Sequence, residues 1–137
     1  MQRLEGWNSL LIDAIEAHRP YPFEWGVHDC AILSADAVMA VVGIDLARGY
    51  RSNYNDRAGA TKNLQQHGFS SHVEIVEQAF QEIHPSETLV GDLAVVKTRY
   101  GPATAPIIGS EVAVYATKGI TIQSLSEVLR AFRVEIR

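Results

Sequence analysis

A change of hydrophobic period near Gly91 constrains the fold of this chain more than any other feature of its sequence. Before Gly91, apolar residues recur at helical spacing, which predicts helices over residues 3–17, 30–42, 56–67 and 71–80, with an ordered loop over 44–55. After it, the pattern predicts strands over residues 92–98, 105–108, 111–116, 120–125 and 132–136, with a helical turn as an alternative for 124–130. The expected class is α+β, a helical N-terminal half packed on a C-terminal antiparallel sheet.

The length of 137 residues suits one domain, which we expect to span residues 1–137. No stretch approaches the roughly 20 apolar residues of a membrane helix, and the N-terminus lacks a signal-peptide pattern, so we expect no membrane insertion. The single cysteine excludes an internal disulfide and suits a reducing compartment. A formal net charge of -4, without a basic stripe, argues against a nucleic-acid partner.

Cys30 is the residue best placed for chemistry. Asp29 is predicted to cap the helix that ends at Gly43, which puts Cys30 at the first helical position, where the helix dipole lowers a thiol pKa. The acidic neighbour Asp29 opposes that effect. A core role is the alternative, because a lone cysteine on a helix rich in Ala, Ile and Val is often a small buried residue.

Two motifs carry a resemblance to a known family. The segment Trp25-Gly26-Val27-His28-Asp29-Cys30 resembles the nucleophile segment of the NlpC-type cell-wall peptidases, a branch of the papain-like cysteine hydrolases, and Gly91-Asp92-Leu93 resembles their entry into the central sheet. With Gly43-Ile44-Asp45 and Gly49-Tyr50, the chain is similar to an uncharacterised branch found among the tail genes of tailed phages and prophages. The resemblance implies a papain-like fold and a cleft beside Trp25, Gly26, His28 and Asp29.

The expected catalytic base is missing. In the family the histidine follows Gly-Asp-Leu, but the last histidine of this chain, His84, precedes Gly91. In one register the resemblance puts Glu111 at the base position and Gln123 near the orienting position; in another, Ala103 holds the base position. A carboxylate beside the sulfur would raise the thiol pKa and accept protons poorly at neutral pH. Glu111 and Gln123 are more simply explained as solvated strand residues.

The other histidines offer weaker alternatives. His28 is expected to be solvated or to support the helix cap, and nothing in the sequence directs His84 at Cys30. A zinc site from His28, Cys30, His67 and His72 matches no familiar spacing, so we expect no metal and no cofactor. Trp25 and Phe23 are predicted either to line a groove or, more simply, to pack in the core near Trp7.

These observations lead to a hypothesis and two alternatives. The first is a phage tail-tip component on a degenerate hydrolase scaffold, found in the virion tail, assembled in the host cytoplasm and bound to other tail proteins. The second is an active cysteine peptidase or amidase that cleaves peptidoglycan peptides during genome delivery, its base supplied by His28, His84 or a neighbouring subunit. The third is a bacterial binding or immunity-type domain unrelated to phages.

Overall fold

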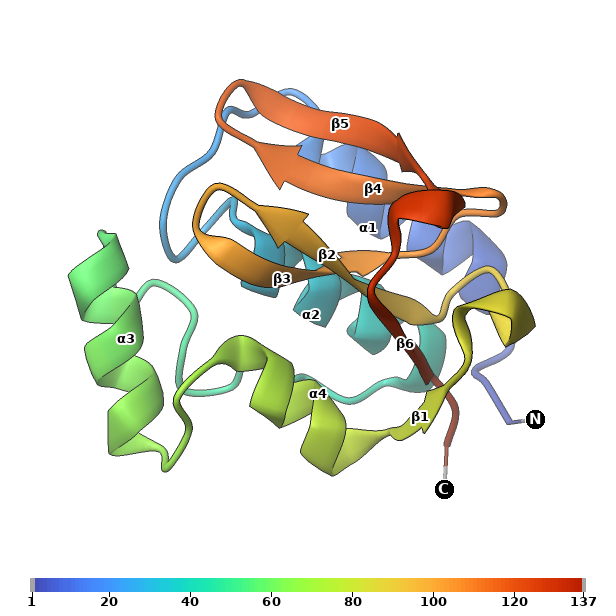
Figure 1. The fold of residues 1–137 in the computed structure, drawn as a ribbon, viewed down its shortest axis with the longest axis horizontal. Helices are drawn as coiled ribbons and strands as arrows, with labels where there is room; N and C mark the ends of the chain where they lie inside the picture. The colour runs from blue at the N-terminus through green and yellow to red at the C-terminus, as the bar shows by residue number, and fades with distance from the viewer. Residues whose placement is uncertain (1, 137) are drawn as a thin grey trace.

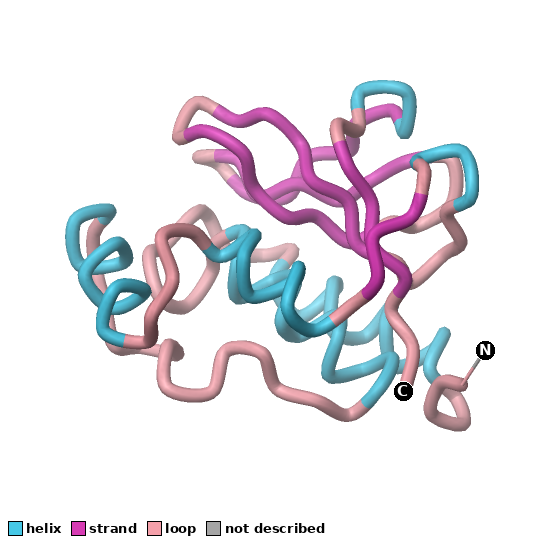
Figure 2. The backbone as a smooth tube through the Cα atoms, turned by 60° about the horizontal axis from the view of Figure 1, so that its bottom comes forward, coloured by secondary structure: helices cyan, strands magenta, loops and turns pink. Residues whose placement is uncertain are grey.

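The computed structural model describes residues 2–136 and has the predicted α+β layout. Four helices come first: α1 (Trp7–His18), α2 (Cys30–Val42), α3 (Arg57–Gln66) and α4 (His72–Ala79). Strand β1 (Gln81–Ile83) follows, and then β2 (Leu93–Thr98), β3 (Gly101–Pro106), β4 (Glu111–Ala116), β5 (Gly119–Ser124) and β6 (Arg130–Arg133), with short 3-10 turns at Pro85–Glu87 and Leu125–Glu127. Figure 2 shows the strands gathered on one side of the molecule and the helices on the other.

Every strand pair is antiparallel, as predicted. Four strands form a sheet in the order β1-β6-β2-β3, and β4 and β5 form a separate hairpin. A single bridge between Ile107 and Val112 joins the chain after β3 to β4. The last strand in the sequence, β6, therefore lies inside the sheet between β1 and β2 (Figure 1).

Helix α2 is the central helix, and it lies behind β2 and β3 in Figure 1. Nine of its 13 residues are buried, because α1 packs on one side of it and β3 on another. A helix that is apolar on nearly all sides must be covered in this way. Gly43 ends it in the left-handed conformation at φ 77°, as its position in the sequence predicts.

The prediction for β3 was wrong by several residues. The strand was expected over residues 105–108, but the turn lies at Arg99-Tyr100, and the strand begins at Gly101, which pairs with Thr98. Pro102 fits here because it lies near the start of the strand, where the hydrogen-bond ladder between β2 and β3 can lack one N–H donor. The later residues Ile107 and Ile108 instead bridge toward β2 and β4.

Other boundaries also differ from the prediction. Helix α1 begins at Trp7 instead of residue 3, because Gly6 has a left-handed backbone (φ 74°) that interrupts the helix. The final strand covers Arg130–Arg133, whereas residues 132–136 were predicted, and the Leu125–Glu127 turn agrees with the helical alternative for residues 124–130. Strand β1 was not predicted, since three residues are too few for a period to be recognised.

The buried carboxylate of Asp92 ties the two ends of the chain together. It is 0% exposed and accepts hydrogen bonds from the guanidinium groups of Arg3 (2.9 Å) and Arg133 (3.1 Å). The backbone amides of Leu89 (2.9 Å) and Val134 (3.0 Å) also donate to it. A buried charge is tolerated when it is fully paired in this way, so the Gly91-Asp92 motif has a structural role in this chain.

Candidate functional site

The turn before α2 is built around the carboxylate of Asp29, which is 3% exposed and has the extended backbone of an N-cap residue. Oδ1 accepts from the amide of Ile32 at 2.8 Å; Oδ2 accepts from the amide of Gly26 at 2.8 Å and from the hydroxyl of Tyr54 at 2.6 Å. Gly26 has φ 82° and lies against the Tyr54 carbonyl, leaving no room for a Cβ. The predicted cap is confirmed, and it fixes Cys30 as the first residue of α2.

The thiol of Cys30 points at the sheet. Its Sγ donates to the backbone carbonyl of Tyr115 in β4 at 3.5 Å. Burial, followed by the negative charge of Asp29, raises the pKa of Cys30 to about 12. The helix dipole, which favours the thiolate, is outweighed by these two effects. Cys30 is therefore a protonated thiol at neutral pH.

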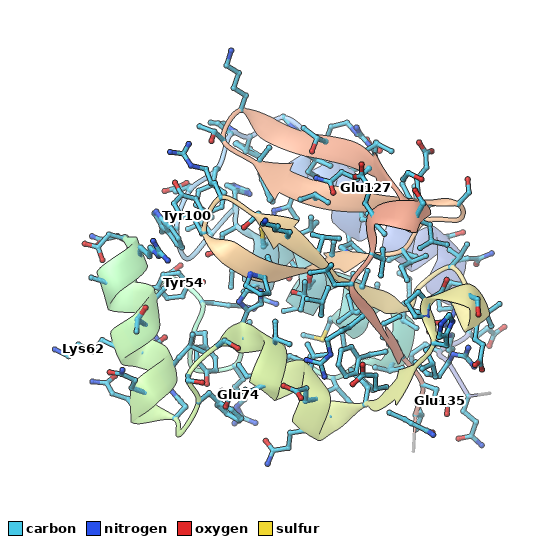
Figure 3. The ribbon with its side chains drawn as sticks, viewed as in Figure 1. Tyr54, Lys62, Glu74, Tyr100, Glu127 and Glu135 are labelled. Carbon is cyan, nitrogen blue, oxygen red and sulfur yellow. The ribbon has the colours of Figure 1, made fainter. Side chains whose placement is uncertain are left out.

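A cavity of about 250 Å³ opens beside this thiol. The elements around it are the start of α2, the loop before α3, α3 itself, the start of α4 and the β2–β3 hairpin. The residues that line it include Cys30, Phe23, Trp25, Tyr54, Tyr100 and His72. In Figure 3, Tyr54 and Tyr100 lie between α3 and the tip of that hairpin. Trp25 contacts Phe23 (ring centroids 4.9 Å apart) and Tyr100 (5.4 Å) edge-on, so both predicted aromatic residues line the groove.

The only imidazole that lines this cavity among residues 2–136 is that of His72, the first residue of α4. Its Nε2 accepts a hydrogen bond from the backbone amide of Thr104 at 3.1 Å. Burial lowers the pKa of His72, so the ring is neutral and its proton is on Nδ1. The nitrogen that could accept a proton is already occupied. Within the described residues, no imidazole makes a hydrogen bond to the sulfur of Cys30.

His28 faces a second, more open groove of about 280 Å³ that does not include Cys30. Its Nδ1 lies 2.9 Å from Nδ1 of His18, and Nε2 of His18 lies 2.5 Å from Oδ2 of Asp36. Arg51 pairs with the other oxygen of Asp36 at 2.6 Å. His28 also stacks on Tyr21, with ring centroids 4.4 Å apart. The predicted role for His28 in solvent or at the cap is replaced by this network.

The tautomers of this network follow from its anionic end. When His18 is neutral and donates Nε2–H to Asp36, its Nδ1 carries a lone pair and accepts from Nδ1–H of His28. Nε2 of a neutral His28 is therefore unprotonated. The chain thus holds a polarised imidazole pair, but it lies in a different groove from the thiol.

Comparison with known families gives a match that covers nearly the whole chain. The model of a domain of unknown function (DUF6950) matches residues 2–134. This protein belongs to the DUF6950 family. No curated protein matches the sequence.

In this DUF6950 member, Glu111 and Gln123 lie away from the cavity. Glu111 is exposed at the start of β4, and Gln123 is paired with Val112 near the same end of the hairpin. The sulfur contacts Tyr115, four residues further along β4, which is about 13 Å at the usual strand rise. Ala103, which the other register puts at the base position, lines the cavity.

Sequence reasoning did not identify His72, Tyr54 or Thr104 as site residues. The Ser71-His72 pair correctly marked a helix start, but no sequence signal indicates which cavity that start faces. His84 is exposed and accepts from the amide of Ser86, so it caps a short turn and has no part in the cavity. Within residues 2–136, no cluster of His, Cys, Asp and Glu has the arrangement of a metal site.

Proposed function

We propose that this DUF6950 protein is a structural component of a phage tail tip, built on an NlpC-like cysteine hydrolase scaffold that no longer hydrolyses. In this proposal it assembles in the host cytoplasm, stays in the virion tail and contacts other tail proteins. No helix within residues 2–136 is both long and apolar enough to cross a membrane.

The loss of activity is supported by one observation: among residues 2–136, no basic side chain makes a hydrogen bond to the sulfur of Cys30. Nucleophilic catalysis by a thiol needs a base within about 3 Å and a third group that orients the base. Here the sulfur donates to the Tyr115 carbonyl, its pKa is raised to about 12, and the single cavity imidazole has its lone pair on the Thr104 amide. Ala103, at the position the resemblance gives to the base, has no group that could replace it.

The tail-tip part of the proposal rests on the resemblance carried by Trp25–Cys30 and Gly91–Leu93. The structural roles of these motifs are consistent with a scaffold that keeps its shape without its chemistry. Asp29 and Gly26 shape the turn, and Asp92 holds the two chain ends. A scaffold that has lost a catalytic group can persist as a binding module.

The decisive test replaces Cys30 in the phage or prophage that encodes the protein. With Cys30→Ala, we expect particles that assemble normally and infect with unchanged titre, because the thiol performs no reaction. Purified wild-type protein should release no peptide from peptidoglycan. Normal assembly combined with a loss of infectivity would contradict the proposal.

An active cysteine peptidase or amidase acting on peptidoglycan peptides is the second candidate, favoured by the fact that Cys30 and His72 share one cavity. To act as a base, His72 would have to release the Thr104 amide and turn an unprotonated nitrogen toward the sulfur. Peptide cleavage that disappears in both Cys30→Ala and His72→Gln would establish this activity. Retained cleavage in Cys30→Ala would assign it to a contaminant, and retained cleavage in His72→Gln alone would exclude His72 as the base.

A further inference from the structure

The mouth of the cavity carries positive charge without a partner. Arg57, the first residue of α3, lines the cavity, and its Cζ lies 5.5 Å from the centre of the Tyr100 ring. The Cζ of Arg99 lies 5.2 Å from the same ring. Within residues 2–136, neither guanidinium makes an ion pair within 4.0 Å, unlike Arg3, Arg51, Arg130 and Arg133. Arg57 therefore brings a cation without an ion-pair partner to the cavity lining, while Arg99 lies against the same Tyr100 ring but outside that lining.

The interior of the cavity is mostly apolar. Ile32, Leu46, Leu64 and Ile75 form one apolar part of its wall, and the aromatic rings described above also line it. Asp29 is the other charged residue among the described lining residues, but both of its oxygens are occupied by three donors. A ligand would therefore meet an apolar wall, a neutral thiol and a cationic mouth.

The volume limits the size of that ligand. Pockets for drug-sized molecules measure roughly 300–1,000 Å³, and this cavity of about 250 Å³ is smaller. It suits a group about as large as one apolar or aromatic amino-acid residue. Rings offer the best match to the walls, because Trp25, Tyr54 and Tyr100 present both faces and edges for packing.

We infer that the cavity binds a compact apolar or aromatic group that bears a carboxylate, with the body among the apolar residues and the carboxylate beside Arg57. This inference rests on the proposed non-catalytic use of the same cavity. The carboxylate chemistry has two sources, the C-terminal residue of a peptide chain and a free organic acid. A guanidinium recognises both through the same charge-assisted hydrogen bonds.

The binding experiment uses 3-phenylpropionate as the free acid, acetyl-Gly-Phe as the peptide terminus, and the neutral amide of each. Binding is followed by NMR through the indole N–H of Trp25, which lines the cavity, with Trp7, which does not, as the internal reference. We expect at least one acid to shift the Trp25 signal and to bind about two- to fivefold more tightly than its amide, as an exposed ion pair allows. The acid that binds identifies the source.

Variants on α3 test the two halves of the inference separately. Arg57→Gln should reduce the affinity of the acid to that of the amide, whereas Lys62→Gln, on the same helix but pointing away from the cavity in Figure 3, should leave the acid preference unchanged. Ala60→Phe should block binding because Ala60 lines the cavity; Ala58→Phe, exposed and outside the lining, should not. Thermal unfolding of each variant checks that the fold is retained.

Two results would overturn the inference: no shift of Trp25 with either acid, or equal affinity of acid and amide in the wild-type protein. Cleavage of the peptide amide is followed in the same samples. Cleavage would contradict the proposed loss of catalysis whatever the binding result. Absence of both binding and cleavage would remove this inference and leave the proposed function intact.

Discussion

The two sides of the segment Glu24–Asp29 contrast sharply. On one side lies the Cys30 thiol, in a cavity whose imidazole, His72, is neutral and has its lone pair occupied. On the other side lie two imidazoles, His18 and His28, aligned on a carboxylate in a groove without a thiol. The chain contains both parts of a nucleophile–base pair, but it keeps them in separate environments.

The separation is produced by backbone geometry. Glu24 and His28 form a bridge in which the amide of Glu24 donates to the carbonyl of His28 at 2.8 Å and the amide of His28 donates to the carbonyl of Glu24 at 2.8 Å. This tight turn directs the His28 ring toward Tyr21 and His18, into the groove that does not include Cys30. Closeness in sequence therefore does not make His28 a base for Cys30.

The thiol side can be tested by its reactivity, where the largest effect is expected. A pKa of about 12 instead of 9.0 leaves about a thousandfold less thiolate at neutral pH, so iodoacetamide should label folded Cys30 far more slowly than an ordinary cysteine. The rate is measured by mass spectrometry, and the urea-unfolded protein is the matched control. Rapid labelling at pH 6 would mean that an activated thiolate exists and would remove the contrast.

The cap of α2 should make the largest contribution to stability among the residues of this segment. Asp29→Ala leaves the donors of Ile32, Gly26 and Tyr54 without their acceptor, so we expect a loss of about 3 kcal/mol in the free energy of unfolding. Urea unfolding measures the change. Tyr54→Phe, which removes only one of these donors, should cost about 1 kcal/mol. Equal losses in the two variants would show that the cap itself contributes little.

The imidazole side should be stabilising but less critical. His18 is 5% exposed and links Asp36 to His28, so His18→Ala should lower the free energy of unfolding by about 2 kcal/mol. The loss is limited because Arg51 remains paired with Asp36. Arg19→Ala, which removes an exposed ion pair with Glu16 at the end of the same helix, should cost less than about 0.5 kcal/mol.

Acid should destabilise the fold through His72 on the thiol side and through His28 on the imidazole side. Burial lowers the pKa of His72, and burial together with the neighbouring His18 lowers the pKa of His28. A lowered folded-state pKa means that the unfolded chain binds more protons, so stability should fall as the pH drops below about 6.5, the usual imidazole value. Urea midpoints between pH 7.5 and 5 measure this loss of stability, and the loss should be smaller in His72→Gln. A wild-type midpoint that does not change with pH would contradict the prediction.

Local sequence signals predicted one side of the site well. Asp29 as cap, Cys30 as first helical residue and Gly43 as the end of α2 depend on nearest neighbours, and all three agree with the structure. Strands β2, β4 and β5 also lie within about one residue of the ranges that their period predicts. These features are set within a few residues of the chain, where propensity and capping dominate.

The features set by distant contacts were not predictable in the same way. The position of the β3 turn decides whether Ala103 or Glu111 comes close to Cys30, and a shift of a few residues in that turn changes the answer. His72 reaches the cavity only because α4 folds back beside β3, and the His18–His28 contact joins two elements with no shared periodic pattern. Tertiary packing alone determines these pairings.

The central place of β6 has a consequence for biosynthesis. Arg133 and Val134 supply two of the bonds to Asp92, and β6 fills the space between β1 and β2, yet these residues are translated after every other strand. Until they leave the ribosome, β1 and β2 have open edges and Asp92 lacks half of its donors. The four-stranded sheet therefore cannot pair completely until this last-made strand takes its place between β1 and β2.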